Sequence, residues 1–315
     1  MSHNHDLRQI LSIEYPVIMA PMFLISNEKM ALAAIKSGIA PCIPALNYRT
    51  LEELQGVLSR LRETGKTYGI NLIVNESNFK MKDQLDLCLE YKVPFIITSL
   101  GSPKEVIEKS HARGMKVFCD VSDMHYAHKA ASYKPDGLIA VTSKAGGHTG
   151  FIEPQKFITD LVREFPTIPI ISAGGVAQKN QIDEMLSYGA CGVSVGSIFI
   201  ASHEAPVTQE YKQACVDYGA KDIVLTTKLS GVPCTVINTP FVQSIGTKQT
   251  WLEKLANKNK RLKKWLKMII YKRGMNLLTK SAFQANYQNV WCAGPSIEEV
   301  KSIRSIQEIV KDLVA

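Results

Sequence analysis

The sequence has no run of about 18 consecutive apolar residues, the length that a membrane-spanning helix needs. Its first residues, 1–6, also lack the charged and then apolar pattern of a secretory signal peptide. These two absences predict a cytoplasmic protein and argue against membrane contact. Because 45% of the 315 residues are hydrophobic, the chain can build a sizeable core in one large domain or two ordinary ones.

Cysteine pairing motifs are also absent. The seven cysteines include no Cys-x-x-Cys pair, the spacing that zinc sites and redox dithiols often use. An odd number of cysteines scattered through apolar runs is typical of reduced, mostly buried thiols. We therefore expect no disulfide framework and no metal site.

A dinucleotide-binding fingerprint is missing as well. No Gly-x-Gly-x-x-Gly follows the first apolar run, and the turn there reads Ala20-Pro21-Met22-Phe23. A dinucleotide fold would need bare backbone at this turn to hold a phosphate, and proline supplies no N–H. The absence argues against a nicotinamide bound in the Rossmann manner.

The formal charge of +8 comes from one late segment. Residues 253–280 contain ten Lys or Arg and one acid, a local charge of +9, so the rest of the chain carries 8 − 9 = −1. The basic balance therefore predicts no nucleic-acid partner for the main body. On a helix, the segment would form an apolar stripe around Trp265, and this stripe could pack over the protein or lie on an anionic membrane.

Short apolar runs alternate with amphipathic stretches from Ile13 onward, as in repeated βα units. The predicted strands are 16–22, 40–45, 68–74, 95–100, 116–121, 137–142, 169–173 and 192–200. The predicted helices are 27–37, 50–64, 80–92, 103–113, 123–133, 154–164 and 178–188, with an eighth beginning near Ser202. Eight such units favour an α/β fold of the closed (β/α)8 TIM-barrel type, with an open doubly wound sheet as the alternative.

Chemistry in such a barrel sits at the C-terminal ends of the strands, and phosphate binds the loops after the last two strands. Small-residue turns stand at both of those loops, 172–176 and 194–198. Each could be an ordinary tight turn, but two in succession favour an anion site. The loop after the sixth strand, 143–150, holds His148 among three glycines, and an imidazole can exchange a proton near neutral pH.

These motifs together resemble the nitronate monooxygenases, a family of FMN-dependent barrel enzymes. The resemblance spans about residues 13–203 and rests on Ala20-Pro21-Met22, Asn71, Ala145-Gly146-Gly147-His148-Thr149-Gly150, Ala173-Gly174-Gly175 and Gly196-Ser197-Ile198-Phe199. The FMN-dependent enoyl-acyl carrier protein reductases share most of the histidine motif.

The resemblance implies a role for each matched residue. The main chain of Ala20, Pro21 and Met22 would border the flavin, Asn71 would hydrogen-bond it, and Gly146 would line it. The FMN phosphate would be held by Gly174, Gly175, Gly196 and Ser197. His148 would be the catalytic residue on the substrate side.

The chain departs from the family before the histidine motif, where Gln-Gly-x-Glu is usual and Val141-Thr142-Ser143-Lys144 stands here. Flavin binding should survive this change, but substrate preference need not. Lys144 is either a solvated lysine or a counter-charge for an anionic nitronate or reduced flavin.

Other candidates are weaker. His125 and His128 lack the carboxylates of a metal site and are expected on the surface. Asp120 and Asp123 flank the end of the fifth strand, where Asp120 could face the rim and Asp123 could cap a helix.

We expect three parts in the chain. Residues 1–220 would form the FMN-binding barrel, 221–290 a mainly helical region beside its mouth, and 291–315 a turn and helix that return to the barrel. In the later parts, Tyr287 or Trp291 is either a wall of the substrate pocket or a core aromatic.

The main functional hypothesis is oxidation of alkyl nitronates by O2 to a carbonyl compound and nitrite, with FMN and without metal. The second is an NAD(P)H-dependent enoyl-acyl carrier protein reductase or a related flavin oxidoreductase. The third is a non-redox phosphate-binding barrel or scaffold. The expected partners are a small-molecule substrate and O2, and a homodimer is held open as the oligomeric state.

Overall fold

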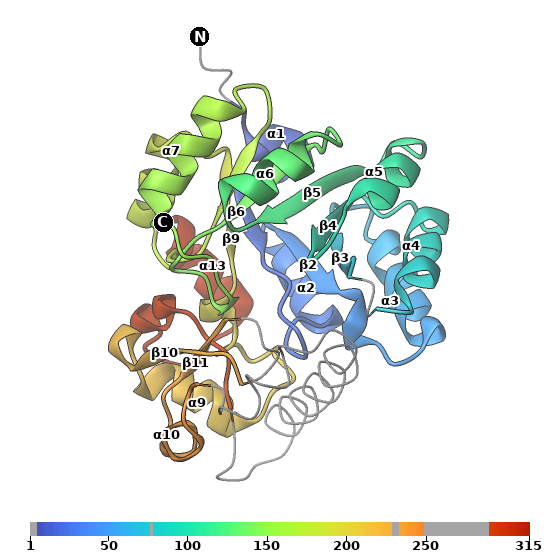
Figure 1. The fold of residues 1–315 in the computed structure, drawn as a ribbon. Helices are drawn as coiled ribbons and strands as arrows, with labels where there is room; N and C mark the ends of the chain where they lie inside the picture. The colour runs from blue at the N-terminus through green and yellow to red at the C-terminus, as the bar shows by residue number, and fades with distance from the viewer. Residues whose placement is uncertain (1–4, 76–77, 229–232, 249–289) are drawn as a thin grey trace, which may run out of the picture.

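The computed structural model describes residues 5–75, 78–228, 233–248 and 290–315. Within them, eight parallel strands close into a barrel in the order β1-β2-β3-β4-β5-β6-β8-β9 (Figure 1). The barrel strands are β1 (Val17–Met19), β2 (Ala40–Pro44), β3 (Gly69–Ile73), β4 (Phe95–Ser99), β5 (Lys116–Val121), β6 (Gly137–Val141), β8 (Ile170–Ala173) and β9 (Gly192–Val195). Each lies within its predicted range. The closed barrel is therefore confirmed, and the open sheet is excluded.

Seven of the helices in the described part of the chain each follow a barrel strand and cover the outside of the barrel. They are α2 (Glu28–Lys36), α3 (Leu51–Glu63), α4 (Met81–Glu90), α5 (Lys104–His111), α6 (Met124–Ala131), α7 (Pro154–Glu164) and α8 (Lys179–Ser187). A short 3-10 turn, η1 (Ala45–Asn47), precedes α3. The seven predicted helices are thus confirmed, with ends shifted by up to two residues.

The eighth predicted helix, near Ser202, is wrong. The next helix, α9 (Gln209–Asp217), starts seven residues later and belongs to the region beside the barrel. The outer position between α8 and α2 is instead taken by the C-terminal helix α13 (Ile306–Val314), which packs against both. Its buried stripe of Ile306, Ile309, Val310 and Leu313 covers apolar surface that would otherwise face water.

Side-chain caps and glycines set the helix boundaries that the sequence predicted. Thr50 accepts the N–H of Glu53 at 3.2 Å and the Glu53 carboxylate accepts the N–H of Thr50, a capping box that starts α3. Asp123 accepts the N–H of Tyr126 at 2.9 Å and so caps α6. Four helices end beside glycines with positive φ, namely Gly38, Gly65, Gly114 and Gly189.

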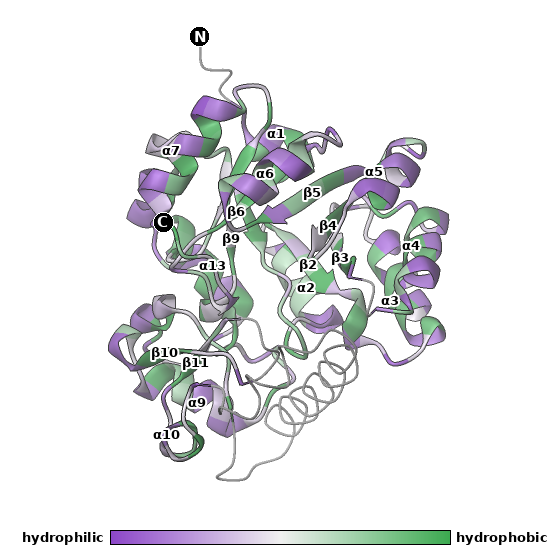
Figure 2. Ribbon diagram, in the orientation of Figure 1, coloured by the Kyte–Doolittle hydropathy of each residue, from purple (hydrophilic) through white to green (hydrophobic). Residues whose placement is uncertain are grey.

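Apolar side chains fill the barrel interior. This cluster comprises Leu7, Leu11, Ile18, Ala40, Cys42, Phe95, Ile97, Phe118, Ile139, Ile171 and Cys191. Leu7 and Leu11 come from a short helix that the sequence analysis missed, α1 (Leu7–Leu11). Because the N–H of Leu7 donates to the carbonyl of Cys191, just before β9, α1 plugs the N-terminal end of the barrel. Figure 2 shows the hydrophobic strands inside helices of mixed hydropathy. The C-terminal rim, meaning the end formed by the C-termini of the strands, is left for chemistry.

A second, antiparallel sheet stands beside the barrel in the order β10-β11-β7. Its strands are β10 (Ile223–Thr226), β11 (Cys234–Ile237) and β7 (Gly147–His148). The same region holds α9, the 3-10 turn η3 (Ala220–Asp222), α10 (Pro240–Ile245) and η4 (Pro295–Glu299). This sheet was not predicted, and it lies in a region that was expected to be mainly helical.

Much of that expected region, 221–290, lies outside the described residues, so the three-part division of the chain stays a prediction. The basic segment with Trp265, and Tyr287, also lie outside them. In the described ranges, every helix is too short or too polar to cross a membrane.

Candidate active site

The loop after β1 carries Ala20, Pro21 and Met22 and is fixed by two polar side chains. Ser26 is buried; its Oγ accepts the N–H of Met22 at 2.9 Å and donates to the carbonyl of Ala20 at 3.2 Å. The Nδ2 of Asn47 donates to the carbonyls of Met22 and Ser26 at 3.3 and 2.7 Å. Neither Ser26 nor Asn47 was predicted as a site residue, although a polar residue shortly after an apolar strand was a usable signal.

Gly174 and Gly175 follow β8 and lie against the loop after β6. A Cβ on Gly174 would sit 2.3 Å from the backbone nitrogen of Ala145, and one on Gly175 would sit 2.9 Å from Lys144 Cβ. Both glycines have positive φ, 113° and 79°. Only glycine satisfies the space and the backbone conformation together.

Gly196, after β9, is different because a side chain would fit there in the protein alone. A Cβ at this position would make ordinary contacts of 3.5 Å with Ala20 Cβ and Met22 Sδ, and its φ is −121°. The contacts show that the loops after β1 and β9 meet on the rim. Close approach of a ligand to the backbone is therefore one physical reason for glycine at this position.

Ser197 joins three loops. Its Oγ accepts the N–H of Gly294 at 2.8 Å, and a Cβ on Gly146 would lie 2.6 Å from the same oxygen. The turn around Gly294 thus returns to the rim and meets the loops after β6 and β9. In the described part of the chain, the Ser197 hydroxyl and the backbone N–H groups of Ser197 and Ile198 donate to no acceptor.

These groups suit a phosphate. A phosphate oxygen needs N–H or O–H donors and backbone without bulky side chains. Ser197 and Ile198 supply the donors, while Gly196 leaves the backbone open beside them. The residues present therefore fit the phosphate end of a flavin mononucleotide.

His148 lies on a strand, whereas the sequence analysis placed it in a free loop. In β7, His148 pairs with Cys234 and Gly147 with Thr235 of β11. The hydroxyl of Thr235 is 3.3 Å from the carbonyl oxygens of both Ala145 and Gly147, to which it donates. Thr235 therefore holds the histidine motif in a fixed place, and this pairing across about 90 residues has no signal in the sequence.

The ring of His148 is suited to accept a proton near neutral pH. Part of the residue is open to solvent, but protein atoms crowd the ring on its other sides. The charged imidazolium is therefore less well hydrated than it would be in water. This desolvation lowers the pKa of His148 below its ordinary value of 6.5. The neutral imidazole therefore predominates at pH 7.

Asn71, the middle residue of β3, takes part in a hydrogen-bonded chain across three strands. Its Nδ2 donates to Ser99 Oγ at 2.8 Å and to the carbonyl of Ile97 at 3.1 Å. Ser99 in turn donates to Asp120 Oδ2 at 2.5 Å. Ser99 was absent from the sequence predictions, and Asp120 was considered there without an assigned partner.

Asp120 is a half-buried acid without a counter-ion. No Lys, Arg or His forms an ion pair with it in the described residues. Burial raises the pKa of Asp120 to about 6, and the hydrogen bond from Ser99 opposes this shift. Its neighbour across the interior, Cys42, is buried, and its pKa is also raised, so that thiol stays neutral.

Lys144 faces an acid. Its Nζ lies 3.9 Å from a carboxylate oxygen of Glu153, and Ser143 Oγ donates to the other oxygen at 2.8 Å. The side chains of Lys144 and Glu153 are 48% and 65% exposed. An ion pair so open to water contributes at most about 1 kcal/mol, which favours the solvated reading of Lys144.

His128 does not join the rim cluster. In α6 it lies 3.5 Å from Glu164 and packs edge-on against Phe165, with 5.1 Å between the ring centroids. His125 of the same helix packs against Tyr126. Across the described residues, no three His, Cys, Asp or Glu side chains gather as a metal-binding group. All seven cysteines are free thiols, as expected, and only Cys292 is partly exposed.

Trp291 supports the turn that reaches the rim. Its ring stacks on the buried Tyr211 of α9 at 5.6 Å, and the Tyr211 hydroxyl donates to the carbonyl of Cys292 at 2.6 Å. Cys292 pairs with Val236 of β11. The turn and the histidine motif thus attach to the same strand.

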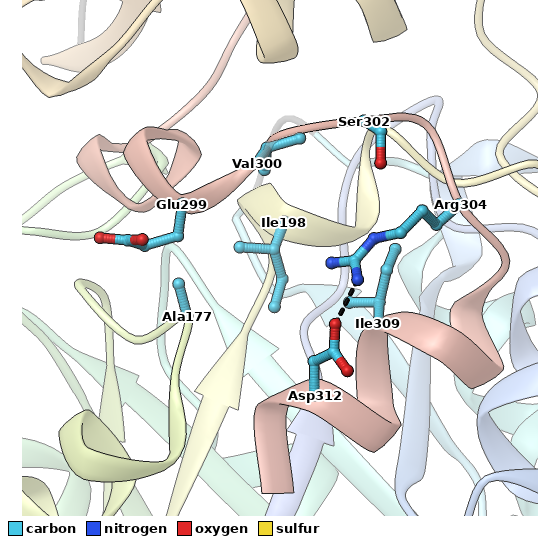
Figure 3. A pocket seen from close by; sticks show the side chains of 8 residues that line it. All are labelled: Ala177, Ile198, Glu299, Val300, Ser302, Arg304, Ile309 and Asp312. Atoms are coloured by element: carbon cyan, nitrogen blue, oxygen red, sulfur yellow. Dashed lines mark hydrogen bonds and ion pairs between the residues drawn. The ribbon is translucent and has the colours of Figure 1, made fainter. Parts of the chain in front are cut away.

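A small cavity lies between η2 (Ser197–Phe199), η4 and α13 (Figure 3). Ile198, Val300 and Ile309 line it, and an ion pair between Arg304 and Asp312 crosses one side. Its volume of about 20 Å³ admits about one water molecule. The cavity is therefore far too small to hold a cofactor.

Comparison with known proteins places this geometry in a family. The model of the family described as nitronate monooxygenase matches residues 63–315. A "probable nitronate monooxygenase" of Staphylococcus aureus (strain JH9) is 24% identical over 291 residues, which cover 78% of this chain and 81% of the relative.

Two further proteins are similar to this chain. A (3aS,4S,5R,7aS)-5-hydroxy-7a-methyl-1-oxo-octahydro-1H-indene-4-carboxyl-CoA dehydrogenase of Rhodococcus jostii (strain RHA1) is 25% identical over 240 residues, 76% of this chain and 67% of the relative. The structure of FabK from Thermotoga maritima superimposes with a TM-score of 0.84 at 25% identity, covering 98% of this chain and 94% of that one.

Proposed function

The chain belongs to the nitronate monooxygenase family and is a flavin-dependent oxidoreductase, and from this premise we propose that it binds FMN and oxidises alkyl nitronates with O2 to a carbonyl compound and nitrite. The observation that carries the proposal is the placement of His148. The backbone of His148 pairs with β11, and Gly146 of the same motif lies against Ser197 in the phosphate-compatible cluster. A proton acceptor thus stands beside the proposed cofactor site.

The residues proposed to hold FMN are those of four rim loops, after β1, β6, β8 and β9, and Asn71. Ser197, with Gly174, Gly175 and Gly196, would bind the phosphate, while Ala20, Pro21, Met22, Gly146 and Asn71 would contact the ring system. When bound, FMN supplies the electron acceptor for the oxidation.

His148 acts on the substrate in this proposal. Because its pKa is lowered, it is neutral at pH 7 and can accept the α-proton of a neutral nitroalkane. For a preformed nitronate that proton is already gone, and the same ring would only donate a hydrogen bond or orient the nitro group. Thr235 keeps the ring in place by holding the motif's carbonyl oxygens.

The direct test uses the full-length protein reconstituted with FMN. After gel filtration, the protein should show the absorbance spectrum of bound flavin. It should then release nitrite from a nitronate in air. A protein that retains no FMN contradicts the cofactor assignment. One that retains FMN but releases no nitrite contradicts the substrate assignment alone.

A second candidate, oxidation or reduction of a carbon chain carried as a thioester, is favoured by one specific comparison. The Rhodococcus relative is named for a carboxyl-CoA substrate. NAD(P)H consumption with an enoyl thioester, in the absence of nitronate, distinguishes this candidate from the first. Membership of a flavin oxidoreductase family sets aside the non-redox barrel. The cytoplasmic location and a homodimer stay predictions.

A further inference from the structure

The hydrogen bonds that link Asn71, Ser99 and Asp120 can run in only one direction, from Asn71 as donor to Asp120 as acceptor. An ionised carboxylate only accepts hydrogen bonds, so Ser99 must give its single hydroxyl hydrogen to Asp120 Oδ2, 2.5 Å away. The lone pairs of Ser99 Oγ are then available, and Asn71 Nδ2 donates to that oxygen at 2.8 Å. Each link in this chain is therefore set by the acid at its end.

The orientation of the Asn71 amide follows. Its Nδ2 also donates to the carbonyl of Ile97 at 3.1 Å, so both amide hydrogens are used. A flipped amide would set Oδ1 against that carbonyl, which has no hydrogen to donate. Asn71 Oδ1 accepts no hydrogen bond from the described residues, and it is not completely enclosed by protein. The free group of Asn71 is thus an acceptor.

A half-buried acid without a counter-ion is costly to keep, which makes a purely structural role a poor explanation. Serine or asparagine at position 120 could also link β4 and β5 without carrying a charge. Serine and asparagine can donate as well as accept, whereas an ionised carboxylate only accepts, so the carboxylate alone fixes the direction of the Ser99 hydroxyl.

We propose that Asp120 is a positioning residue for the flavin: through Ser99 it fixes the Asn71 amide so that Oδ1 accepts the imide N–H of the flavin ring. This inference rests on the proposed FMN site at the rim. The oxidised isoalloxazine ring has one N–H, the imide at N3, and its other polar ring atoms are acceptors. An Asn71 amide that presented its NH2 group would instead recognise the ring carbonyls.

The test compares two cofactors on full-length apo-protein at pH 7.5. FMN and 3-methyl-FMN, in which the imide hydrogen is replaced by methyl, are titrated against the protein, and flavin fluorescence reports each dissociation constant. The wild type should bind FMN at least about tenfold more tightly, the ratio expected for one lost buried hydrogen bond. Asp120→Asn and Ser99→Ala should both reduce this preference to within about threefold.

Thr98→Val is the matched control. Thr98 Oγ1 lies 3.3 Å from Cys119 Sγ, so this variant removes a buried polar contact between the same two strands on their outer face. It should keep the wild-type preference for FMN. Thermal unfolding of each apo-protein, read alongside, confirms that the variants fold.

The outcomes separate the two proposals. If the wild type binds neither flavin, the cofactor site is wrong and this inference falls with it. If the wild type binds FMN but shows no preference over 3-methyl-FMN, or if Asp120→Asn and Ser99→Ala keep the preference, the Asp120 inference alone is overturned. Loss of the preference in Thr98→Val as well would also overturn it, because any break between β4 and β5 would then have the same effect.

Discussion

Ser197 Oγ accepts the backbone N–H of Gly294 at 2.8 Å, joining the end of β9 to a turn 97 residues later in the chain. The bond is buried, and it leaves the serine hydrogen available to a ligand. One hydroxyl thus serves both the closure of the rim and the proposed phosphate site.

Ser197→Ala should weaken both functions. Removing the acceptor leaves the buried N–H of Gly294 without a partner, which should lower the free energy of unfolding of the apo-protein by about 1–3 kcal/mol. Urea unfolding measures this loss, and the FMN dissociation constant should rise in parallel. Ser187→Ala, at an exposed serine on α8, should change neither. An unchanged FMN affinity in Ser197→Ala would remove Ser197 from the phosphate site.

Gly196→Ala should separate an effect on FMN binding from an effect on the stability of the protein. Its new Cβ would meet Ala20 and Met22 at ordinary distances, so the apo-protein should keep its melting temperature. If a phosphate approaches the backbone there, the FMN dissociation constant should still rise about tenfold or more.

Gly175→Val cannot make that distinction, because positive φ and contact with Lys144 would strain the protein with or without a ligand.

The control for Gly196→Ala is Gly56→Ala on α3, which should raise helix stability without changing FMN affinity. Full FMN affinity in Gly196→Ala would show that the phosphate lies elsewhere.

His148→Ala should separate proton transfer from positioning. The backbone pairing of β7 with β11 does not need the ring, so FMN content and melting temperature should stay close to wild type. We expect kcat/KM for a neutral nitroalkane to fall about 10²- to 10⁴-fold, the usual value of a general base. The loss for a preformed nitronate should be far smaller.

His128→Ala, on α6, is the control and should keep both activities. Equal losses on the two substrates in His148→Ala would point to positioning and against a base.

The pH profile provides an independent check on His148. Since desolvation lowers its pKa below 6.5, kcat/KM for a neutral nitroalkane should be full at pH 7 and fall as the pH drops through that lowered pKa. The neighbouring Cys234 does not titrate in this range because its pKa is raised well above 9.0. Asp120 does, with a pKa of about 6, so the profile is measured with FMN kept saturating at every pH. The lowered pKa of His148 means that the folded state binds this proton less tightly than the unfolded chain, so stability also falls below pH 6.5. An acid limb at or above pH 6.5, or one that persists in His148→Ala, would contradict the assignment.

The sequence by itself determined the barrel. Alternating apolar runs and amphipathic stretches are local properties of the chain, and buried parallel strands with surface helices follow from them without knowledge of distant contacts. The helix starts at Thr50 and Asp123 and the glycine ends were equally readable, because capping depends on residues three or four positions apart. The rim position of the glycine turns followed from the rule that all eight strands end on the same side.

Tertiary structure alone decided how the rim is completed. Strand β11 pairs with His148, and α13 fills the place of the eighth helix, although neither partner is near in sequence. A two-residue strand such as β7 has no periodicity to detect. The link from Asn71 through Ser99 to Asp120 also needed the structure, because it depends on the register between β3, β4 and β5. A sequence shows which face of its own strand a residue takes, but the height of that residue beside its neighbours is fixed only when the barrel closes.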